Sequence, residues 1–413
     1  MARVGGLPLP TITDDRALGS ADIQRSLRFN RGDSPYLSRA LGSPTSDDKA
    51  SVSVWLKRTD VSTDNTFFDN YQGSNDRLSM TLVSSTDGDK FSVYQRDSSG
   101  VVCNLLTTQV FRDPSAWYHI LVAFDTTQGA AADRVKIYVN GTQITAFDTS
   151  TYFSQNHNLR AGSGYTTNVG RYGAGSNYFG GYMAEFNYID GQQLSPTDVG
   201  FTDSQTGIWM PKRYEGSYGN NGFRLDFSDN SSTAALGIDK SPNGNDFTTN
   251  NFSVSAGTGN DSFVDTPTNV FATLNPLVGR GANYLTYTNG NLDFTISPSS
   301  TYPKPVSTFN IPTSGKWYVE WVFTTIGSAV VGVGNVDKAE ESGAANQLNG
   351  INYLYNGDIR VNDSQTQGSF TSWSANDVIG VKVDRDAGTI AFTLNGSAQG
   401  NPENISSMNT PTD

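Results

Sequence analysis

The sequence has little cysteine, histidine and charge. It holds one cysteine and two histidines in 413 residues, and 16% of its residues are charged. A single cysteine, Cys103, allows no disulfide within the chain, so burial of apolar groups must stabilise the fold, as suits a reducing cytoplasm. The opening MARVGGLPLP lacks the apolar core of a secretory signal, and no apolar run is long enough to cross a bilayer. We therefore expect no membrane insertion.

Positive charge is scarcer than negative charge. The chain has 28 Lys and Arg against 40 Asp and Glu, a formal net charge of −12. A protein that binds nucleic acid needs a Lys/Arg-rich face to neutralise phosphates, and no such run occurs. The composition thus disfavours nucleic acid and anionic membranes as partners, whereas an acidic surface can hold divalent cations.

Short alternating apolar segments between Gly, Asn and Ser turns dominate the sequence. Residues 116–144 and 378–399 are two such hairpins, closing on Asn140-Gly141 and Asn395-Gly396, which suit tight turns with positive φ. In the alternating segments, one face holds Val52, Val54 and Leu56, another Leu78, Met80 and Leu82, another Ile120, Val122 and Phe124, and another Tyr182, Ala184, Phe186 and Tyr188. This period of two predicts antiparallel β-sandwiches.

The composition changes along the chain and predicts four parts. Residues 1–25 are Pro/Gly-rich and are expected to form an arm, and residues 26–200 a first sandwich. Residues 201–280 are rich in Asn and Ser and predict an irregular connector with one or two strands. Residues 281–413 predict a second, smaller sandwich, which is either incomplete or completed by a neighbouring subunit because the chain stops soon after its last hairpin.

Several blocks resemble concanavalin A-like, laminin-G-type jelly rolls: SLRFNRGDSPYLSRALG, FRDPSAWYHILVAFDTT and YFGGYMAEFNYIDGQQLSPTDVG. More narrowly, residues 22–270 are similar to domains in structural proteins of marine and cyanobacterial tailed phages. Residues 283–400 resemble a SPRY-like sandwich through GKWYVEW and VIGVKVDRDAGTIAFTLNG, although the terminal strand of that family is not apparent. The predicted fold is all-β, with two antiparallel β-sandwiches joined by an irregular connector.

The resemblance implies a virion structural protein: a fibre, a spike or a head decoration. Such a protein folds in the host cytoplasm and lies on the virion exterior. Its implied partners are other virion proteins, copies of itself (a trimer is expected for a fibre) and host cell-surface polysaccharide. Two alternatives stay open, an assembly module that binds no glycan and a polysaccharide-degrading enzyme. The family supplies no shared catalytic residues.

Candidate catalytic groups are few, and a non-enzymatic protein is predicted. Glu185 and Asp190 could serve as a glycosidase pair, but their odd spacing puts them on opposite faces of a regular strand. His119 lies within a strand and predicts a hydrogen-bonded structural histidine, while His157 lies in a loop and predicts a solvated one. Cys103, in an apolar strand, predicts an inert buried thiol.

Two loops are candidates for Ca²⁺. One contains Asp239, Asn243 and Asp246, and the other contains Asp69, Asn70 and Asp76. Carboxylate and amide oxygens suit this cation. A hydrogen-bonded, Asx-rich turn without metal explains the first loop equally well.

The glycine-rich segment GSGYTTNVGRYGAGSNYFGG offers the best contact surface. Tyrosine rings pack against pyranose faces while Asn groups bind hydroxyls, and the segment holds Tyr165, Tyr172, Asn177 and Tyr178. These residues predict either a carbohydrate site or a contact with another virion subunit. The tripeptide Arg31-Gly32-Asp33 is predicted to be a chance sequence at a turn rather than an integrin motif.

Overall fold

The structure is a computed structural model that describes residues 22–61, 63–84, 87–278, 284–297, 303–334, 350–362, 364–368 and 370–408. Two compact units follow one another, with their boundary between Val270 and Phe271. Most of the expected arm over residues 1–25 lies outside the described residues. Nearly all regular structure is antiparallel β, so the predicted fold class is confirmed.

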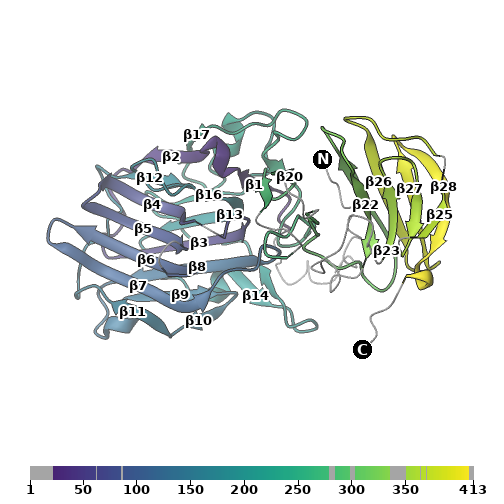
Figure 1. The fold of residues 1–413 in the computed structure, drawn as a ribbon. Coiled ribbons are helices and arrows are strands. Elements are labelled where there is room, and N and C mark those ends of the chain that lie inside the picture. Colours follow the sequence, from purple (N-terminus) through teal and green to yellow (C-terminus); the bar gives the residue numbers. More distant parts are fainter. Residues whose placement is uncertain are drawn as a thin grey trace. The chain divides into compact units, whose positions relative to one another are not determined.

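The first sheet of the first unit has the strand order β10-β9-β8-β3-β13-β1-β18, and β16 also pairs with β13. Its strands are β1 (Ser26–Phe29), β3 (Lys49–Arg58), β8 (Trp117–Asp125), β9 (Val135–Val139), β10 (Thr142–Ile144), β13 (Gly181–Asp190), β16 (Phe223–Leu225) and β18 (Ser262–Phe263). They are drawn in purple to green in Figure 1. β3 and β13 lie at the middle of this sheet.

The second sheet has the order β11-β7-β6-β5-β4-β12-β2-β17. Its strands are β2 (Tyr36–Ala40), β4 (Asn65–Gly73), β5 (Asp76–Val83), β6 (Lys90–Asp97), β7 (Gly100–Val110), β11 (Phe147–Thr151), β12 (Thr166–Val169) and β17 (Thr248–Asn250). Three short 3-10 helices also belong to this unit: η2 (Arg31–Asp33), η3 (Ala131–Asp133) and η4 (Ala234–Gly237).

The core of the first unit lies between these two sheets. Val54 of β3 is opposite Ile120 of β8, and Met80 of β5 is opposite Val93 of β6. All four are buried in one continuous apolar cluster. The period of two therefore predicted these inward faces correctly, because alternate side chains of a strand point to the same side.

Strand β13 departs from regular alternation at Glu185. This residue has φ of +46°, and the register with β3 shifts between Ala184 and Asn187. An extra residue in a strand moves every later side chain to the other face. Phe186 and Tyr188 consequently lie in the main core, whereas Tyr182 and Ala184 lie in a separate cluster. The prediction that these four share one face was wrong, because no sequence pattern marks the bulge.

The segment predicted to be a connector contributes strands to the first unit up to residue 270. β16 pairs with β13, β17 with β2 and β18 with β1. These strands have three, three and two residues, too few for alternation to show in the sequence. The segment is therefore part of the first sandwich.

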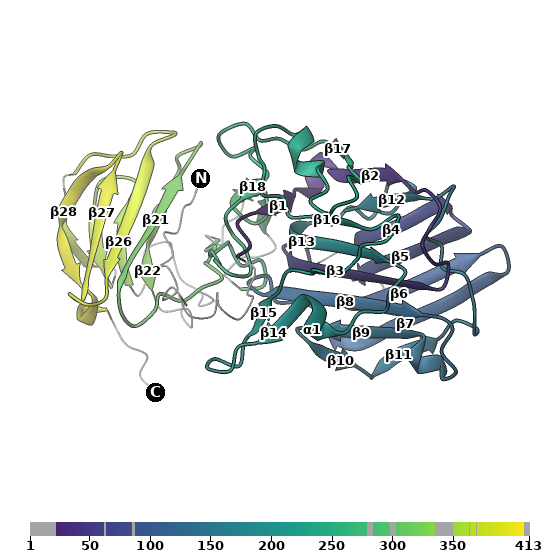
Figure 2. The same ribbon diagram turned by 180° about the vertical axis from the view of Figure 1, so that it is seen from behind.

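Chain following β13 covers the outer face of the first sheet. Helix α1 (Pro196–Val199) and the ribbon of β14 (Gly200–Thr202) and β15 (Trp209–Pro211) lie beside β8 and β9 (Figure 2). The covering contacts form two clusters, one of Leu121, Ile189, Leu194, Val199, Tyr214 and Tyr218, the other of Ile23, Trp55, Trp117, Tyr182 and Ala184 with Trp209, Phe263 and Val270 packed against it. The central strands β3, β8 and β13 of this sheet are thus buried on both sides, whereas the edge strand β10 is largely exposed.

The second unit has two four-stranded sheets, β21-β26-β27-β28 and β22-β23-β24-β25, and a hairpin β19-β20. Its elements are β19 (Leu285–Thr288), β20 (Asp293–Ile296), β21 (Lys316–Val322), β22 (Val330–Gly334), β23 (Gly350–Leu354), β24 (Ile359–Val361), β25 (Ser364–Gln367), β26 (Val378–Asp384), β27 (Thr389–Leu394), β28 (Ser397–Asn404) and η7 (Ile405–Ser407). Ile351, Ile379 and Phe392 lie in its core. Within the described residues, no helix has the length and apolar content needed to cross a membrane.

The two Asn-Gly turns have the predicted backbone conformation. Asn140 and Gly141 have φ of +47° and +77°, and Asn395 and Gly396 have +48° and +81°. Both residues of each turn are therefore left-handed, as the tight turn between two twisted strands requires. These repeated hairpins form part of the scaffold in each unit.

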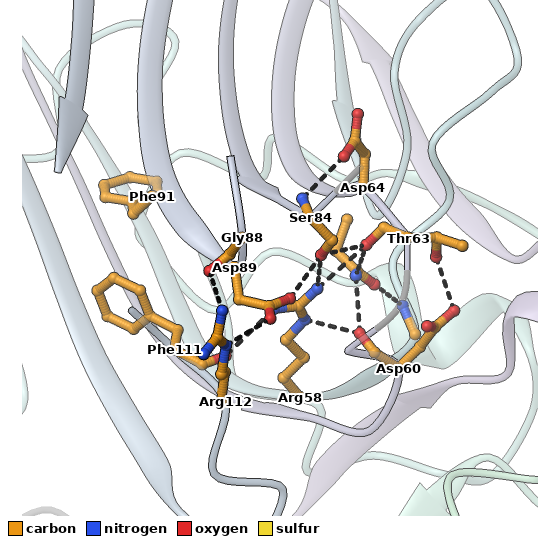
Figure 3. Close-up of polar contacts among 12 residues, drawn as sticks. Arg58, Asp60, Thr63, Asp64, Ser84, Gly88, Asp89, Phe91, Phe111 and Arg112 are labelled. Atoms are coloured by element: carbon orange, nitrogen blue, oxygen red, sulfur yellow. Dashed lines mark hydrogen bonds and ion pairs between the residues drawn. The ribbon is translucent and has the colours of Figure 1, made fainter. Parts of the chain in front are cut away.

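A buried ionic network lies at one end of the first sandwich (Figure 3). The Arg58 side chain is 0% exposed and its Nη1 donates to Asp89 Oδ1 at 2.8 Å and to the Phe111 carbonyl at 3.1 Å. Arg112, 56% exposed, donates from Nε to the other oxygen of Asp89 at 2.9 Å. Burial alone would raise the pKa of Asp89, but hydrogen bonds from Ser84 and Arg112 and the charge of Arg58 hold this pKa below its usual value.

The shared carboxylate permits a matched comparison of a buried and an exposed arginine. Arg58→Met should destabilise the protein by roughly 3–5 kcal/mol, because Asp89 loses its buried counter-charge and the Phe111 carbonyl loses its donor. Arg112→Met should cost less than about 1 kcal/mol, because its ion pair is screened by water. Urea unfolding of both variants checks this. If both variants lost the same small amount of unfolding free energy, burial would add nothing to the stability that the Arg58–Asp89 pair contributes.

Candidate binding face on the second sheet

The outer face of the second sheet carries partly exposed tyrosines and arginines. Tyr71 of β4 is opposite Arg77 of β5, which is opposite Arg96 of β6. Tyr94 lies on the same face of β6, two residues from Arg96. All four side chains are only half-buried. We refer to Tyr71, Arg77, Tyr94 and Arg96, together with the loop 171–178, as the tyrosine-arginine face.

The loop 171–178 is closed by a hydrogen bond of its own and is held to this sheet by a hydrogen bond to Asp69. Tyr172 N donates to Ser176 O at 3.0 Å, and Gly173 N donates to Asp69 Oδ2 of β4 at 2.7 Å. A side chain at Gly173 would begin 2.3 Å from the Tyr71 ring. The glycine therefore lets the loop lie directly against Tyr71.

Arg77 and Arg171 each stack on tyrosine rings of this face. The Arg77 guanidinium is 4.7 Å from the ring centre of Tyr172 and 5.0 Å from that of Tyr94, and its Nη1 donates to the Tyr172 hydroxyl at 2.8 Å. Tyr71 meets Tyr172 edge to face, with 5.5 Å between ring centres. Arg171 lies 3.4 Å from the ring centre of Tyr36. Each stack orients a ring and restricts its motion.

Asp69 is the buried anchor beneath the loop. It accepts hydrogen bonds from Ser79 Oγ and from Gly173 N. Burial raises the pKa of Asp69 to about 6, because the surroundings disfavour the charged carboxylate. The hydrogen bonds and the charges of Arg77 and Arg171 lower this pKa only in part. Asp69 thus titrates near neutral pH.

The four residues predicted for the contact surface lie in different surroundings. Tyr172 packs on Tyr71, while Tyr178 packs on Tyr36 with 6.5 Å between ring centres. Asn177 is exposed with φ of +49°, and its carbonyl accepts from Thr66 N at 2.9 Å. It therefore acts as a turn residue.

Tyr165 lies apart from the loop, beside Asp76. Its side chain is hydrogen-bonded to that carboxylate, and burial is the largest cause of a raised pKa for its hydroxyl. The structure thus brings Tyr172 and Tyr178 onto one face of the sheet and places Tyr165 next to the Asp76–Arg160 pair.

The calcium candidate formed by Asp69, Asn70 and Asp76 does not converge on one point. Asp69 and Asn70 are consecutive in β4 and so point to opposite faces of the sheet. Asn70 Oδ1 accepts from Thr167 Oγ1 at 2.7 Å, and Asp76 Oδ1 lies 2.8 Å from Arg160 Nε. Their side chains are therefore engaged in three separate places.

The calcium candidate formed by Asp239, Asn243 and Asp246 is a hydrogen-bonded loop. The Asp239 carboxylate accepts from Arg224 N, from Asn245 N and from both the backbone and hydroxyl of Ser241, at 2.7–2.8 Å. Asp246 Oδ1 accepts from Asp239 N at 2.8 Å. The Asn243 amide donates to the carbonyls of Gly219 and Gly222. These bonds account for the loop as an Asx-rich turn.

Charge near that loop is already balanced in part. The Arg39 guanidinium donates to Asn245 Oδ1 and interacts electrostatically with Asp239 and Asp246. Across the described residues, no three His, Cys, Asp or Glu side chains are grouped as a metal site would require. Calcium binding stays a prediction.

The carboxylates weighed as a glycosidase pair are both tied to the protein. Glu185 receives two hydrogen bonds from Arg224, at 2.6 and 2.8 Å. Asp190 accepts from Thr45 N at 2.7 Å and from Asn221 N at 3.0 Å. Glu185 serves to hold β16, and Asp190 holds the loops at the end of β13.

The remaining reactive groups have structural roles. The His119 ring lies between two polar groups. Its Nε2 is 2.9 Å from Ser53 Oγ, and its Nδ1 accepts a hydrogen bond from Trp209 Nε1 at 3.1 Å. Burial lowers the pKa of His119 to about 3, so the ring is neutral, as predicted for a structural histidine. Burial also raises the pKa of the Cys103 thiol, which makes it unreactive.

The structure also shows the surroundings of His157 and of the Arg31-Gly32-Asp33 tripeptide. His157, predicted to be solvated, is half-buried and stacks on Phe153, with ring centres 5.5 Å apart. Arg31 of the Arg-Gly-Asp tripeptide donates to Asp64 O and Asn65 Oδ1 and pairs with Asp60 at 2.7 Å. Its side chain is thus part of the fold.

Sequence reasoning missed the arginines and the tyrosines on the strands. Alternation in β5 and β6 puts Arg77, Tyr94 and Arg96 on the outward face, so that signal was available. What it does not give is which strands are neighbours, or that the loop 171–178 folds back over β4.

With this geometry established, comparison with known proteins identifies the domain. A family model described as the concanavalin A-like lectin/glucanases superfamily matches residues 31–200. The chain therefore contains a concanavalin A-like, laminin-G-type domain in its first unit. A search of curated proteins found no match.

Solved structures with a similar fold are distant. A SAP-like pentraxin from Limulus polyphemus is 16% identical with a TM-score of 0.32, over 43% of this chain and 80% of the pentraxin. Tailspike protein 2 of an Escherichia coli O157:H7 bacteriophage is 15% identical with a TM-score of 0.32, over 42% of this chain and 23% of the tailspike. Domains LG4-5 of the mouse laminin alpha1 chain are 9% identical with a TM-score of 0.32, over 99% of this chain and 82% of theirs.

Asp69 should make stability depend on pH. Because folding raises its pKa to about 6, the folded protein binds a proton more tightly than the unfolded chain does. This contribution is fully present below about pH 4 and is lost as the pH rises through about 6. The melting temperature of the wild type should therefore rise relative to that of Asp69→Asn between pH 7 and pH 5. Parallel melting curves at all pH values would contradict this.

Proposed function

We propose that this chain is a non-enzymatic structural protein on the exterior of a tailed-phage virion that adsorbs to host-surface glycans through the tyrosine-arginine face. The observation that supports this most is the asymmetry of the first sandwich. The outer face of one sheet is buried under the chain's own segments, whereas the other presents half-exposed tyrosines held by stacking and hydrogen bonds. Fixed rings are the surfaces on which pyranoses pack.

The family match is consistent with this proposal, since its description includes lectins. That description also includes glucanases, so an enzyme is the rival reading. The engagement of Glu185 by Arg224, and of Asp190 by backbone N–H groups, argues against a catalytic pair at β13. Release of reducing sugar from a bound polysaccharide would favour the enzyme.

The phage assignment rests on the resemblance of residues 22–270 to phage structural proteins. We also propose that the second unit is a SPRY-like sandwich, because GKWYVEW and VIGVKVDRDAGTIAFTLNG form β21 and the β26–β27 hairpin. As a fibre the chain would form a trimer with other virion proteins around it. Several copies on one particle would convert weak sugar contacts into durable attachment.

Removal of one ring from the face tests glycan binding. Tyr172→Ala should weaken binding to a recognised polysaccharide roughly fivefold, since a stacking contact contributes about 1 kcal/mol. Tyr172→Phe keeps the ring and should bind nearly as the wild type does. Binding is measured by biolayer interferometry on a panel of bacterial surface polysaccharides, with and without EDTA.

Tyr355→Ala is the matched control, because Tyr355 is an exposed tyrosine of the second unit, at 37%. It should leave binding unchanged. Loss of binding in EDTA would support a bound calcium ion. If no polysaccharide binds and the protein is instead retained firmly in particles, the assembly module is the correct function.

A further inference from the structure

We infer that the tyrosine-arginine face selects acidic glycans, with Arg77 and Arg96 binding a carboxylate or sulfate group of the sugar. This inference rests on the proposed function and adds to it the chemical class of the ligand. The contacts of the two arginines, their charge balance and the adjoining rings support it in turn.

Arg77 and Arg96 are directly opposite each other on neighbouring strands and point to the same face. Side chains in this relation have Cβ atoms about 5 Å apart, and like charges there are destabilising. The chain has an excess of acidic residues, 40 against 28 basic ones, from which a partner could have come. A repulsive pair in such a protein indicates that an anion from outside balances it.

Other arginines of the first unit do have acidic partners. Arg28 pairs with Asp261 at 3.0 Å, Arg58 with Asp89 at 2.8 Å, and Arg224 with Glu185 at 2.6 Å. Among the residues that the structure describes, neither Arg77 nor Arg96 has a carboxylate in ion-pair distance. Some other arginines, such as Arg39 and Arg134, also lack an ion pair within the described residues, but they donate to uncharged oxygens. Arg77 and Arg96 differ from them because the two guanidinium-bearing side chains are directly opposite each other.

Donor groups on both arginines are left for a ligand. Arg77 uses Nη1 for the Ser74 carbonyl and the Tyr172 hydroxyl, at 2.5 and 2.8 Å. In the described part of the chain, Nη2 of Arg77 and both Nη atoms of Arg96 form no hydrogen bond, whereas the Nε atoms of both residues are buried. Guanidinium groups bind carboxylate and sulfate oxygens through paired N–H donors.

The rings next to these arginines would fit the sugar that carries the acid. Arg77 is stacked between Tyr172 and Tyr94, so a pyranose resting on either ring would bring its substituents close to the guanidinium. Asp69 interacts electrostatically with Arg77, but both of its oxygens accept hydrogen bonds and it is buried beneath the loop. It therefore offsets little of the positive charge.

Three polymers with one backbone test the inference: dextran, carboxymethyl-dextran and dextran sulfate. The wild type should bind one or both acidic polymers at least tenfold more tightly than dextran, and the two acidic arms distinguish carboxylate from sulfate. Arg77→Gln/Arg96→Gln should remove this preference and make binding less dependent on salt, because two ionic contacts are lost. Arg112→Gln, an exposed arginine at the Asp89 network, should bind as the wild type does.

Stability provides a second measurement that does not depend on the polymer. If the two arginines repel each other, Arg96→Gln should keep or raise the melting temperature, and an acidic polymer should raise that of the wild type. A large loss of stability in Arg96→Gln would overturn the inference, because the pair would then have a structural role.

The inference and the proposed function fail in different ways. If neutral polysaccharides bind through Tyr172 and the double arginine variant binds acidic polymers as the wild type does, only the choice of acidic glycans is overturned. If neither these polymers nor the wider polysaccharide panel binds, the glycan-binding function fails, and the inference fails with it. If Arg112→Gln weakens binding to the acidic polymers as much as the double arginine variant does, the binding reflects general charge attraction. This result would also overturn the inference.

Discussion

The bulge at Glu185 determines how the first unit divides its surfaces. It turns Phe186 and Tyr188 into the core and leaves Glu185 outside it, where Arg224 binds its carboxylate through two hydrogen bonds. Arg224 belongs to β16, so this ion pair attaches the segment that follows β13 to the sheet. Parts of that segment cover the outer face of the first sheet, whereas the outer face of the second sheet carries half-buried tyrosines and arginines.

Charge is used differently in the two halves of this sandwich. Inside the fold, carboxylates such as Asp190 and Asp239 accept backbone hydrogen bonds and fix loops, and buried arginines such as Arg58 are neutralised by acidic partners. On the second sheet, Arg77, Arg96 and Arg171 instead stack on or lie beside tyrosines. The same residue type thus closes buried ion pairs in one region and orients tyrosine rings in the other.

The rings of the tyrosine-arginine face are held in place by strands and by their neighbours. Tyr71 and Tyr94 project from β4 and β6, and Tyr172 is held by Tyr71, Arg77 and the bonds of its own loop. Side chains held in this way lose little conformational entropy when a ligand binds. If the chain is displayed in many copies, as proposed above, weak individual contacts would suffice.

The sequence by itself determined the all-β class, the inward faces of β3, β5 and β8, and the left-handed Asn-Gly turns, because these depend on alternation and on residues close in the chain. It also selected the loop that carries Tyr172 and Tyr178. Only the tertiary structure decided that Phe186 and Ala184 lie on different faces, since a bulge leaves no mark in the hydrophobic pattern. Tertiary structure alone likewise made Arg77 and Arg96 neighbours and brought the loop 171–178 over Tyr71, because strand order and chain return are set by packing between distant segments.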